Sequence, residues 1–207
     1  MPAPIALLQA RRLAYTHPGQ SAPLFADLSF DLTPGLSLIR GGDGRGKTSL
    51  LRLIAGELAP GAGQILRSAD TASCSFEQPA DPVHDPVLAR AWLAERRAGR
   101  FAATWLPALE LGLIEGLGLS PHMDKPMFML STGSRRKLGL VAAAASGAAL
   151  TLLDTPYAAL DARSGRLLSE LLAEAADSAQ RAWVIADYAL PAGLGGVALA
   201  ALIELGD

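Results

Sequence analysis

Hydrophobic residues in the first third of the chain follow two different periodicities. Residues 24–32 alternate loosely between apolar and polar positions and end at a Thr-Pro-Gly sequence, which predicts a strand followed by a turn. Residues 36–39 form a short apolar run that stops before Gly41. Residues 48–58 then carry leucines and an isoleucine at helical spacing, and a Pro-Gly pair follows them. The pattern predicts a strand, a glycine loop and a helix in succession.

The middle of the chain changes character. Residues 81–126 contain five prolines and show helical patterns near residues 88–97 and 105–117. A continuous apolar run follows at residues 149–153, which is typical of a parallel strand buried on both faces. The other elements that we expect in the second half are helices at residues 131–145 and 164–176 and strands at residues 182–186 and 199–205.

Alternating strands and helices predict an α/β fold with a mostly parallel sheet that is covered by helices. A chain of 207 residues fits one domain, which we expect to span residues 1–207. The region rich in proline and helical patterns would be a helical subdomain of roughly residues 81–145, inserted between two halves of the α/β core.

Composition narrows the classes of function. Half of the residues are hydrophobic and 18% are charged, so the chain has enough apolar surface to bury a core. The formal net charge of −2 gives no electrostatic reason to expect nucleic acid as a partner. Arg135, Arg136 and Lys137 stand together, and a solvent-exposed helix face is the simplest interpretation of that triplet.

The cysteine content and the hydropathy of the chain bear on the cellular compartment in which the protein works. Cys74 is the only cysteine, which excludes an internal disulfide and suits a reducing environment. The N-terminal segment has its charges after its apolar residues, unlike a secretory signal. The apolar stretches at residues 138–153 and 191–205 are shorter than the roughly 20 residues that a membrane-spanning helix needs. We interpret both as buried helix or strand, and we expect a soluble chain.

The glycine loop matches the phosphate-binding pattern G-x-x-x-x-G-K-[ST] in full, with Gly41, Gly42, Asp43, Gly44, Arg45, Gly46, Lys47 and Thr48. Glycines let successive backbone N–H groups turn toward an anion, where a Cβ would crowd the phosphates. The positive end of the following helix points at the same place. We expect Lys47 to reach the β- and γ-phosphates of ATP and the Thr48 hydroxyl to ligate Mg²⁺. The alternative is a glycine-rich turn that happens to contain a lysine.

A phosphate loop of this type needs a second oxygen ligand for the metal at the end of a neighbouring apolar strand. Asp154 ends the apolar run Leu150-Thr151-Leu152-Leu153 and supplies such a carboxylate. An aspartate in this place can also simply cap a turn. Together with the glycine loop, it predicts a magnesium ligand.

These motifs resemble those of the ATP-binding cassette proteins, the nucleotide-binding subunits of ABC transporters. Residues 50–56, with Pro60 and Gly63 after them, are similar to the segment that follows the phosphate loop in such cassettes. Leu130-Ser131-Thr132-Gly133-Ser134 resembles the LSGGQ signature, with Ser134 in place of Gln. Residues 154–161 resemble the Walker B strand end and the D-loop, which includes Asp161. Each match is short, but all of them stand in the family's order over nearly the whole chain.

The resemblance implies a P-loop NTPase core with an N-terminal antiparallel β portion. It implies that two cassettes pack head to tail, so that Ser131 and the Gly133 backbone contact a γ-phosphate bound to the partner. The remaining roles implied by the resemblance are Tyr15 against adenine, Ser49 and Asp161 at the nucleotide, Gln78 as the Q-loop glutamine beside the metal, and Lys47, Asp154 and Gln78 as catalytic residues.

The resemblance also implies partners and a location. The cofactors would be ATP and Mg²⁺, and the partners would be a second cassette, identical or different, and integral membrane subunits that contact the helical subdomain. The chain would be cytoplasmic and peripheral on the inner face of the cell membrane. In its small size it resembles the ATP-binding subunit of the bacterial haem exporter used in cytochrome c maturation.

Two positions depart from the family's pattern. Members that hydrolyse ATP usually have Glu directly after the Walker B aspartate, where this chain has Thr155. A hydroxyl cannot accept a proton as a carboxylate does. The family's switch histidine should follow the strand at residues 182–186, where Asp187 stands, or Tyr188 if the register slips by one. We therefore expect a cassette that binds ATP and Mg²⁺ but hydrolyses ATP slowly as a homodimer, or that pairs with a second, competent cassette.

Three classes of function remain open at this point. The leading one is the energising subunit of a membrane transporter. A second is a soluble cassette in nucleic-acid or ribosome biology, which would usually carry paired cassettes or a basic surface. A related alternative is a regulatory pseudo-ATPase that binds ATP. A third is a small-molecule kinase that uses the same loop, but it has no need of Ser131 or Asp161.

Overall fold

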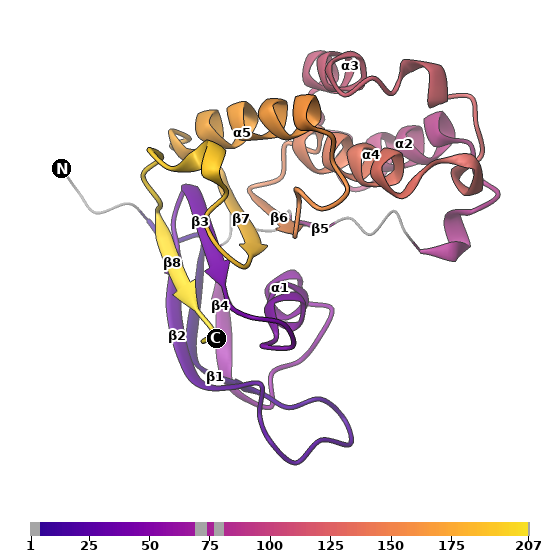
Figure 1. Cartoon of the computed structure of the whole chain (residues 1–207). Helices are drawn as coiled ribbons and strands as arrows, with labels where there is room; N and C mark the ends of the chain where they lie inside the picture. Colours follow the sequence, from indigo (N-terminus) through magenta and orange to yellow (C-terminus); the bar gives the residue numbers. More distant parts are fainter. Residues whose placement is uncertain (1–4, 69–73, 77–80, 207) are drawn as a thin grey trace. The chain divides into compact units, whose positions relative to one another are not determined.

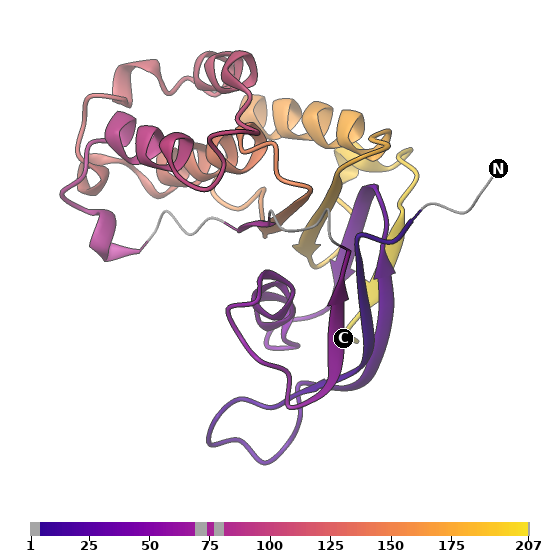
Figure 2. The same ribbon diagram turned by 180° about the vertical axis from the view of Figure 1, so that it is seen from behind.

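The glycine loop follows a strand in the interior of a parallel sheet. The computed structural model describes residues 5–68, 74–76 and 81–206, which fold as two compact units. Unit 1 comprises residues 1–76, 149–155 and 172–207, and unit 2 comprises residues 77–148 and 156–171. Figure 1 shows the chain and Figure 2 shows it from behind. The inserted region predicted at residues 81–145 falls within unit 2, which also takes in residues after Asp154.

Unit 1 contains the five-stranded parallel sheet, in the order β5-β6-β7-β3-β8. The predicted strands form close to their expected bounds. They are β3 (Gly35–Arg40), β6 (Leu150–Asp154), β7 (Ala182–Asp187) and β8 (Ala201–Glu204), with a short β5 (Cys74–Phe76) at the edge. Every residue of β3 except Arg40, and every residue of β6 and β7 except the last, is buried. The expectation that the run at residues 149–153 forms a buried parallel strand is therefore confirmed.

Unit 1 also contains the antiparallel part, a three-stranded sheet in the order β2-β1-β4. Its strands β1 (Leu8–Tyr15), β2 (Phe25–Leu32) and β4 (Ala62–Arg67) lie side by side in Figures 1 and 2. Only β2 was predicted from the pattern of hydrophobic residues. The antiparallel register of β1 is irregular between Ala10 and Leu13, and Arg12 there has a positive φ of 50°. This bulge breaks the alternation on which a prediction of β1 would depend.

The helix after the glycine loop, α1 (Lys47–Ala55), is shorter than predicted. It ends at Ala55 because Gly56 takes the left-handed conformation, with φ of 83°, and its N–H bonds back to the carbonyls of Arg52 and Leu53. The expected extension to residue 58 is wrong for this reason. Gly56 closes the helix one turn before the Pro-Gly pair.

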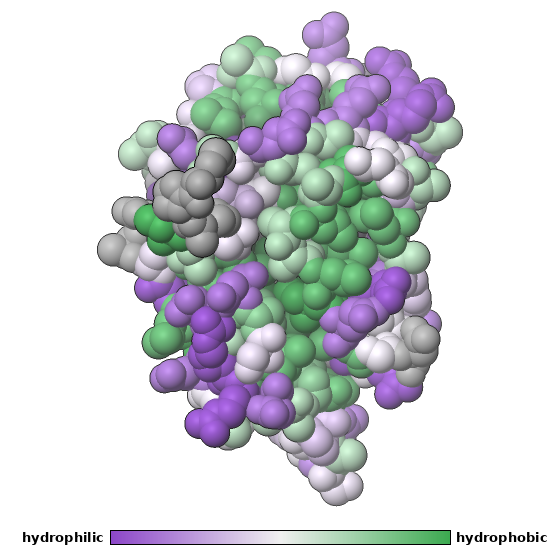
Figure 3. Space-filling model, turned by 90° about the vertical axis from the view of Figure 1, so that its left-hand side faces the viewer, coloured by the Kyte–Doolittle hydropathy of each residue, from purple (hydrophilic) through white to green (hydrophobic). Residues whose placement is uncertain are grey.

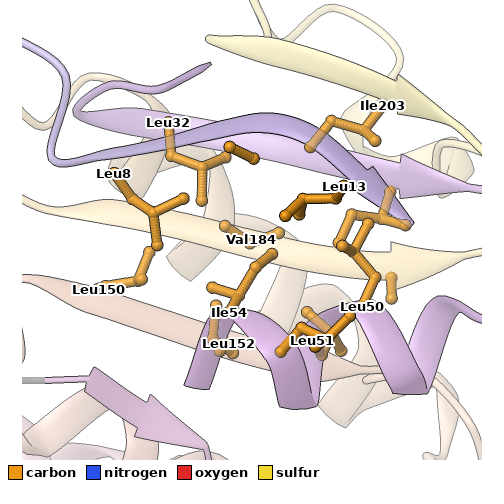
Figure 4. Packing of buried hydrophobic residues seen from close by; sticks show 14 of the residues in the cluster. Leu8, Leu13, Leu32, Leu50, Leu51, Ile54, Leu150, Leu152, Val184 and Ile203 are labelled. Carbon is orange, nitrogen blue, oxygen red and sulfur yellow. The ribbon is translucent and has the colours of Figure 1, made fainter. Parts of the chain in front are cut away.

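Hydrophobic side chains of α1 join both sheets into one core. Figure 4 shows Leu50, Leu51 and Ile54 of α1 beside Leu152 and Val184 of the parallel sheet. Leu8, Leu13 and Leu32 of the antiparallel sheet belong to the same buried cluster. Burial of each such side chain contributes about 1.5–3 kcal/mol relative to exposure. The helix that carries the phosphate loop is thus fixed by the centre of the core.

Unit 2 is helical. It contains α2 (Ala89–Ala98), α3 (Pro107–Gly116), α4 (Thr132–Ala145) and the short 3₁₀ turns η2 (Pro82–His84), η3 (Ser120–His122) and η4 (Met127–Met129). Helix α4 contacts both α2 and α3, and all of its residues from Leu138 onward are buried. Glu110 is also buried, and its carboxylate accepts a 2.7 Å hydrogen bond from the indole of Trp105. The Arg97 guanidinium lies 3.4 Å from the same oxygen, so the buried carboxylate has two partners.

Helix α5 (Ala162–Ala176) begins in unit 2 and ends in unit 1 along the chain. It corresponds to the predicted amphipathic helix. A 3₁₀ turn, η5 (Ala192–Leu194), precedes β8 near the C-terminus. The apolar stretch 191–205 contains these two elements and the connection between them, and only Leu194 and Ile203 within it are buried. The interpretation of that stretch as buried is therefore wrong for most of its residues, because the connection lies at the surface and β8 is buried only at Ile203.

Hydrophobic residues also reach the surface. Figure 3 shows a broad area of them on one face, bordered by hydrophilic residues. In the part of the chain that the structure describes, no helix has both the length and the hydropathy to cross a membrane.

Two glycines with nearly equal backbone angles provide a test of the β1–β4 contact. Gly63 has φ of +81°, and a Cβ there would lie 2.3 Å from the Arg12 carbonyl oxygen, whereas Gly19 has φ of +82° and open space around it. Gly19→Ala should cost about 1 kcal/mol of unfolding free energy through φ alone. Gly63→Ala should cost at least about 2 kcal/mol more because β4 must also move away from β1. Urea denaturation of both variants would measure the difference, and equal losses would contradict the close approach.

Candidate functional site

The phosphate loop occupies residues 41–46, between the end of β3 and the start of α1. Gly44 and Gly46 have positive φ values of 73° and 94°, which favour glycine. A Cβ at Gly46 would also lie 3.0 Å from the Leu24 side chain. Gly46 is the N-cap of α1 and has no side chain to cap the helix, so the first amides of α1 have no side-chain partner at that position.

Residues after β8 hold the phosphate loop by backbone hydrogen bonds. The N–H of Gly42 donates to the carbonyl of Gly206 at 3.1 Å, and the N–H of Leu205 donates to the carbonyl of Arg40 at 2.8 Å. A Cβ at Gly41 would lie 3.1 Å from the Leu205 Cβ. The segment after β8 therefore packs directly against the first turn of the loop, a contact that no sequence motif indicates.

Lys47 begins α1 and is 8% exposed. Its Nζ donates to the carbonyl oxygens of Gly41 and Gly42 at 2.7 and 2.8 Å. The same Nζ lies 4.3 Å from the centre of the Tyr188 ring. The side chain that the sequence assigns to the β- and γ-phosphates thus folds back over its own loop.

Thr48 and Asp154 come together although 106 residues separate them. The Thr48 hydroxyl donates to Oδ2 of Asp154 at 2.5 Å. Asp154 ends β6, and α1 packs on β5, β6 and β7, so the second residue of α1 reaches the carboxyl end of the sheet. A hydroxyl and a carboxylate at this edge form a suitable oxygen donor set for Mg²⁺ beside a triphosphate. Among the described residues, no group of three or more His, Cys, Asp or Glu side chains forms an alternative metal site.

Ser49 and Tyr15 are placed in the core beneath the loop. Ser49 is 6% exposed, and its hydroxyl lies 3.2 Å from Nε2 of His17. Tyr15 is 7% exposed and packs against His17 and Phe25. The adenine contact predicted for Tyr15 stays a prediction, and it requires more of the ring than this packing leaves open. His17 is the neighbour that sequence reasoning did not assign to the site.

Asp43 and Arg45 are the exposed charged residues of the loop. Asp43 accepts a hydrogen bond from the hydroxyl of Tyr188, which is itself 54% exposed. That hydrogen bond raises the pKa of Tyr188 above its ordinary value, because it stabilises the protonated hydroxyl. Tyr188 is a site residue that the sequence indicated only as an alternative to Asp187.

Asp187 and Thr155 occupy the ends of adjacent strands. Asp187 pairs in register with Arg40, the residue before the loop, and its Oδ1 accepts the N–H of Tyr188 at 2.8 Å. Thr155 follows Asp154 with a positive φ of 43°, and its N–H donates to the carbonyl of Ala186 at 2.8 Å. A β-branched residue in this conformation is strained by about 1–3 kcal/mol. Both departures from the family pattern therefore lie at the carboxyl edge of the sheet.

The signature segment lies in unit 2. Ser131 is the N-cap of α4, and its Oγ accepts the N–H of Ser134 at 3.1 Å. A Cβ at Gly133 would lie 2.5 Å from the carbonyl oxygen of Ala159, which has a positive φ of 61°. Glycine is thus required at position 133 by the close approach of the D-loop backbone, independently of any nucleotide.

Asp161 caps α5 and pairs with α4. Its Oδ1 accepts the N–H of Ser164 at 2.9 Å, and its Oδ2 accepts the Ser164 hydroxyl and the Lys137 ammonium at 3.0 and 2.6 Å. Lys137 and these Ser164 groups hold the pKa of Asp161 well below its usual value. A nucleotide contact of Asp161 remains a prediction beside this structural role.

The basic triplet at residues 135–137 is not a solvated face. The side chains of Arg135 and Lys137 are each only 15% exposed, and they pair with Asp85 and Asp161 at 2.5 and 2.6 Å. The interpretation as a solvent-exposed face is therefore wrong for these two residues. Long side chains at the start of α4 tie it to η2 and to the D-loop. Gln78, the predicted Q-loop residue, lies outside the described residues.

A parallel sheet with a glycine loop between β3 and α1, flanked by helices and joined to an antiparallel sheet, defines a P-loop nucleotide-binding protein. The sequence profile described as ABC transporter matches residues 25–158. The chain belongs to the ABC transporter family and is an ATP-binding subunit of that family.

Two curated relatives illustrate the range of this similarity. The cytochrome c biogenesis ATP-binding export protein CcmA of Pseudomonas syringae pv. syringae is 35% identical over 184 residues, which cover 81% of each chain. The taurine import ATP-binding protein TauB of Pseudomonas savastanoi pv. phaseolicola is 34% identical over 179 residues, which cover 81% of this chain and 67% of that protein.

Solved structures agree on the fold. An ATP-binding subunit of an ABC transporter superposes with a TM-score of 0.70 at 18% identity, over 89% of this chain and 80% of that one. The cbiO1 protein of Clostridium perfringens, part of the ABC transporter complex cbiONQ, gives a TM-score of 0.63 at 18% identity, over 89% and 79%. The predicted α/β P-loop fold with an antiparallel part is confirmed.

The Asp161–Lys137 pair predicts a pH-dependent contribution to stability. Because the pKa of Asp161 is lower in the folded than in the unfolded chain, its contribution is fully present above about pH 4 and is lost as the pH falls further. Asp161→Asn keeps a side chain that can cap Ser164 but removes the ion pair, so it should lower the urea midpoint at pH 7. The deficit should shrink between pH 4 and pH 3. A loss of stability that is the same at pH 7 and at pH 3 would contradict the role of the charge. So would a loss that is equally large when Asp161→Asn is made in a Lys137→Gln background.

Proposed function

We propose that the chain binds the triphosphate of ATP in the loop at residues 41–48 and uses nucleotide binding to power a membrane transporter. The observation that carries the proposal is the convergence of Lys47, Thr48 and Asp154 at one edge of the parallel sheet. The backbone amides of the loop and the start of α1 add positive potential at the same place. A small-molecule kinase, or a glycine-rich turn that happens to contain a lysine, would not explain the family match that spans both units.

Thr48 and Asp154 would hold Mg²⁺, since their oxygen atoms already face each other. The metal would neutralise phosphate charge when it is bound. Lys47, which now contacts the carbonyls of Gly41 and Gly42, would gain a phosphate oxygen as a stronger, charge-assisted partner. The catalytic contribution of Gln78 rests on the family resemblance alone.

ATP-binding subunits of ABC transporters work as dimers together with membrane subunits. In this chain we assign the contact with the second cassette to the exposed start of α4 and to the D-loop. Ser131 fixes the N-terminus of α4, and Gly133 and Asp161 position the two segments against each other. These contacts would present the first amides of α4 to a γ-phosphate on the partner.

We assign the contact with membrane subunits to unit 2. Val83, Phe128 and Met129 are exposed by 68, 61 and 59%, and they lie on η2 and η4, which contact each other. The N–H of Phe128 donates to the carbonyl of Asp85 at 3.1 Å, so the two turns are fixed together. Clustered exposed apolar side chains are typical of an interaction site. Such a subunit would work at the cytoplasmic face of the membrane.

The relatives named for import and for export share the nucleotide-binding machinery, so the proposal concerns this machinery and leaves the choice of cargo to the membrane subunits. We further propose that the chain hydrolyses ATP slowly when it is its own partner. Thr155 offers no basic group beside Asp154, and Asp187 places a carboxylate at the position of the family's histidine. A second cassette with a competent site would restore turnover.

Binding of ATP provides the first test. Calorimetry should detect Mg-ATP binding to the unmodified chain, and Lys47→Ala should weaken it at least about tenfold by removing a charge-assisted contact. Thr48→Val should reduce the gain in affinity that Mg²⁺ gives. Lys125→Ala, a lysine in unit 2, is the matched control and should bind normally. Failure of the unmodified chain to bind Mg-ATP at millimolar concentration would refute the proposal.

Hydrolysis provides the second test. Thr155→Glu introduces a carboxylate next to Asp154 and should raise the rate of phosphate release at saturating Mg-ATP, by up to about 10²- to 10⁴-fold for a well-placed base. Thr155→Gln has a similar shape but no basic group, so it should leave the rate low. Brisk turnover of the unmodified chain that Thr155→Glu does not change would show that the native site is already competent.

A further inference from the structure

The ammonium group of Lys47 has all of its donors engaged. It carries three N–H groups, of which two are directed at the carbonyls of Gly41 and Gly42. The ring of Tyr188 lies 4.3 Å from the same nitrogen, within the range of a cation–π contact. A phosphate oxygen that approaches Lys47 must therefore replace one of these three partners.

Tyr188 is held over the loop by hydrogen bonds at its backbone and at its hydroxyl, and not by burial of its ring in the hydrophobic core. It directly follows β7, and Asp187 accepts its backbone N–H. Its hydroxyl donates to Asp43, the third residue of the phosphate loop, while 54% of the residue stays exposed. The ring thus spans the loop from Asp43 to Lys47 without being buried. A side chain with this anchorage can move away without opening the hydrophobic core.

The two contacts of Tyr188 mask the charges that a phosphate would meet. The ring faces the cation of Lys47, and the hydroxyl satisfies the carboxylate of Asp43. Of the three partners of Lys47, the ring is the weakest, because a cation–π contact at an exposed site is worth less than a hydrogen bond to a charged group. The ring is accordingly the partner that an anion displaces at the lowest cost.

We propose that Tyr188 is a self-inhibitory cap on the phosphate loop, which occupies Lys47 and must swing away from Asp43 and Lys47 before a triphosphate binds. The inference rests on the proposed function of the loop. It gives the residue after β7 a role in setting the affinity for nucleotide, in addition to any role in hydrolysis. The cap acts on the phosphate part of the ligand and is indifferent to the base.

A test on the unmodified protein follows the ring directly. The chain has three tyrosines, Tyr15, Tyr157 and Tyr188, so ¹³C-labelled tyrosine gives a spectrum with three ring environments. Mg-tripolyphosphate, which has no base, should shift the Tyr188 ring signal, assigned with Tyr188→Phe, and leave that of Tyr157 in place. A Tyr188 signal that does not change while tripolyphosphate binds would overturn the cap.

The affinity test uses two backgrounds, because removal of Tyr188 also leaves the Asp43 carboxylate without its partner. Tyr188→Ala in an Asp43→Asn background removes the ring from Lys47 without leaving a carboxylate unpaired, and it should tighten binding of Mg-ATP and of Mg-tripolyphosphate by about two- to fivefold. Asp43→Asn itself should tighten binding more when Tyr188 is present than in the Tyr188→Ala chain, since it then also loosens the cap. Leu66→Ala, another exposed side chain of unit 1, is the control and should leave both affinities unchanged.

The outcomes separate the two proposals. Weaker binding by Tyr188→Ala in the Asp43→Asn background would make Tyr188 a phosphate ligand and overturn the cap, and an unchanged affinity would overturn it as well. In both cases the unmodified chain still binds Mg-ATP, and the proposed function stands. Absence of binding by every variant, at millimolar Mg-ATP and Mg-tripolyphosphate, would instead refute the phosphate site and the cap together.

Discussion

The site depends on the folded-back contact between the ammonium of Lys47 and the carbonyls of Gly41 and Gly42. A charged group that is only 8% exposed needs such partners, because an unpaired charge in that position would be costly. The contact is available only if β3 and α1 meet at a fixed angle across the loop. The leucines of α1 enforce that angle by their burial against the parallel sheet (Figure 4). The packing of the core therefore also sets the position of Lys47 at the phosphate loop.

The order of the strands assembles the rest of the site. Strand β7 lies between β3 and β6, so Asp154, Asp187 and the end of β3 come to one edge of the sheet. In a parallel sheet the carboxyl ends of the strands meet at one edge, and ligands bind there. Metal ligand, cap and phosphate loop thus come from segments far apart in the sequence but adjacent in the sheet.

Residues of the signature and the D-loop carry structural tasks beside the roles that the family implies. Gly133 admits the carbonyl of Ala159, Ser131 caps α4, and Asp161 caps α5 while it pairs with Lys137. A substitution at these positions would therefore change unit 2 itself as well as any contact with nucleotide. Binding measurements on such variants require a parallel measurement of stability to be interpreted.

The sequence by itself determined the phosphate loop, the central strands and most helices, because each depends on local spacing of glycines or of apolar residues. It did not determine β1, whose bulge breaks the alternation, the end of α1 at Gly56, or the ion pairs of Arg135 and Lys137. The contacts of Tyr188 with Asp43 and Lys47 join residues more than 140 positions apart. Only the tertiary structure decides such contacts, because they follow from which strands are neighbours, and strand order is not written in any local pattern.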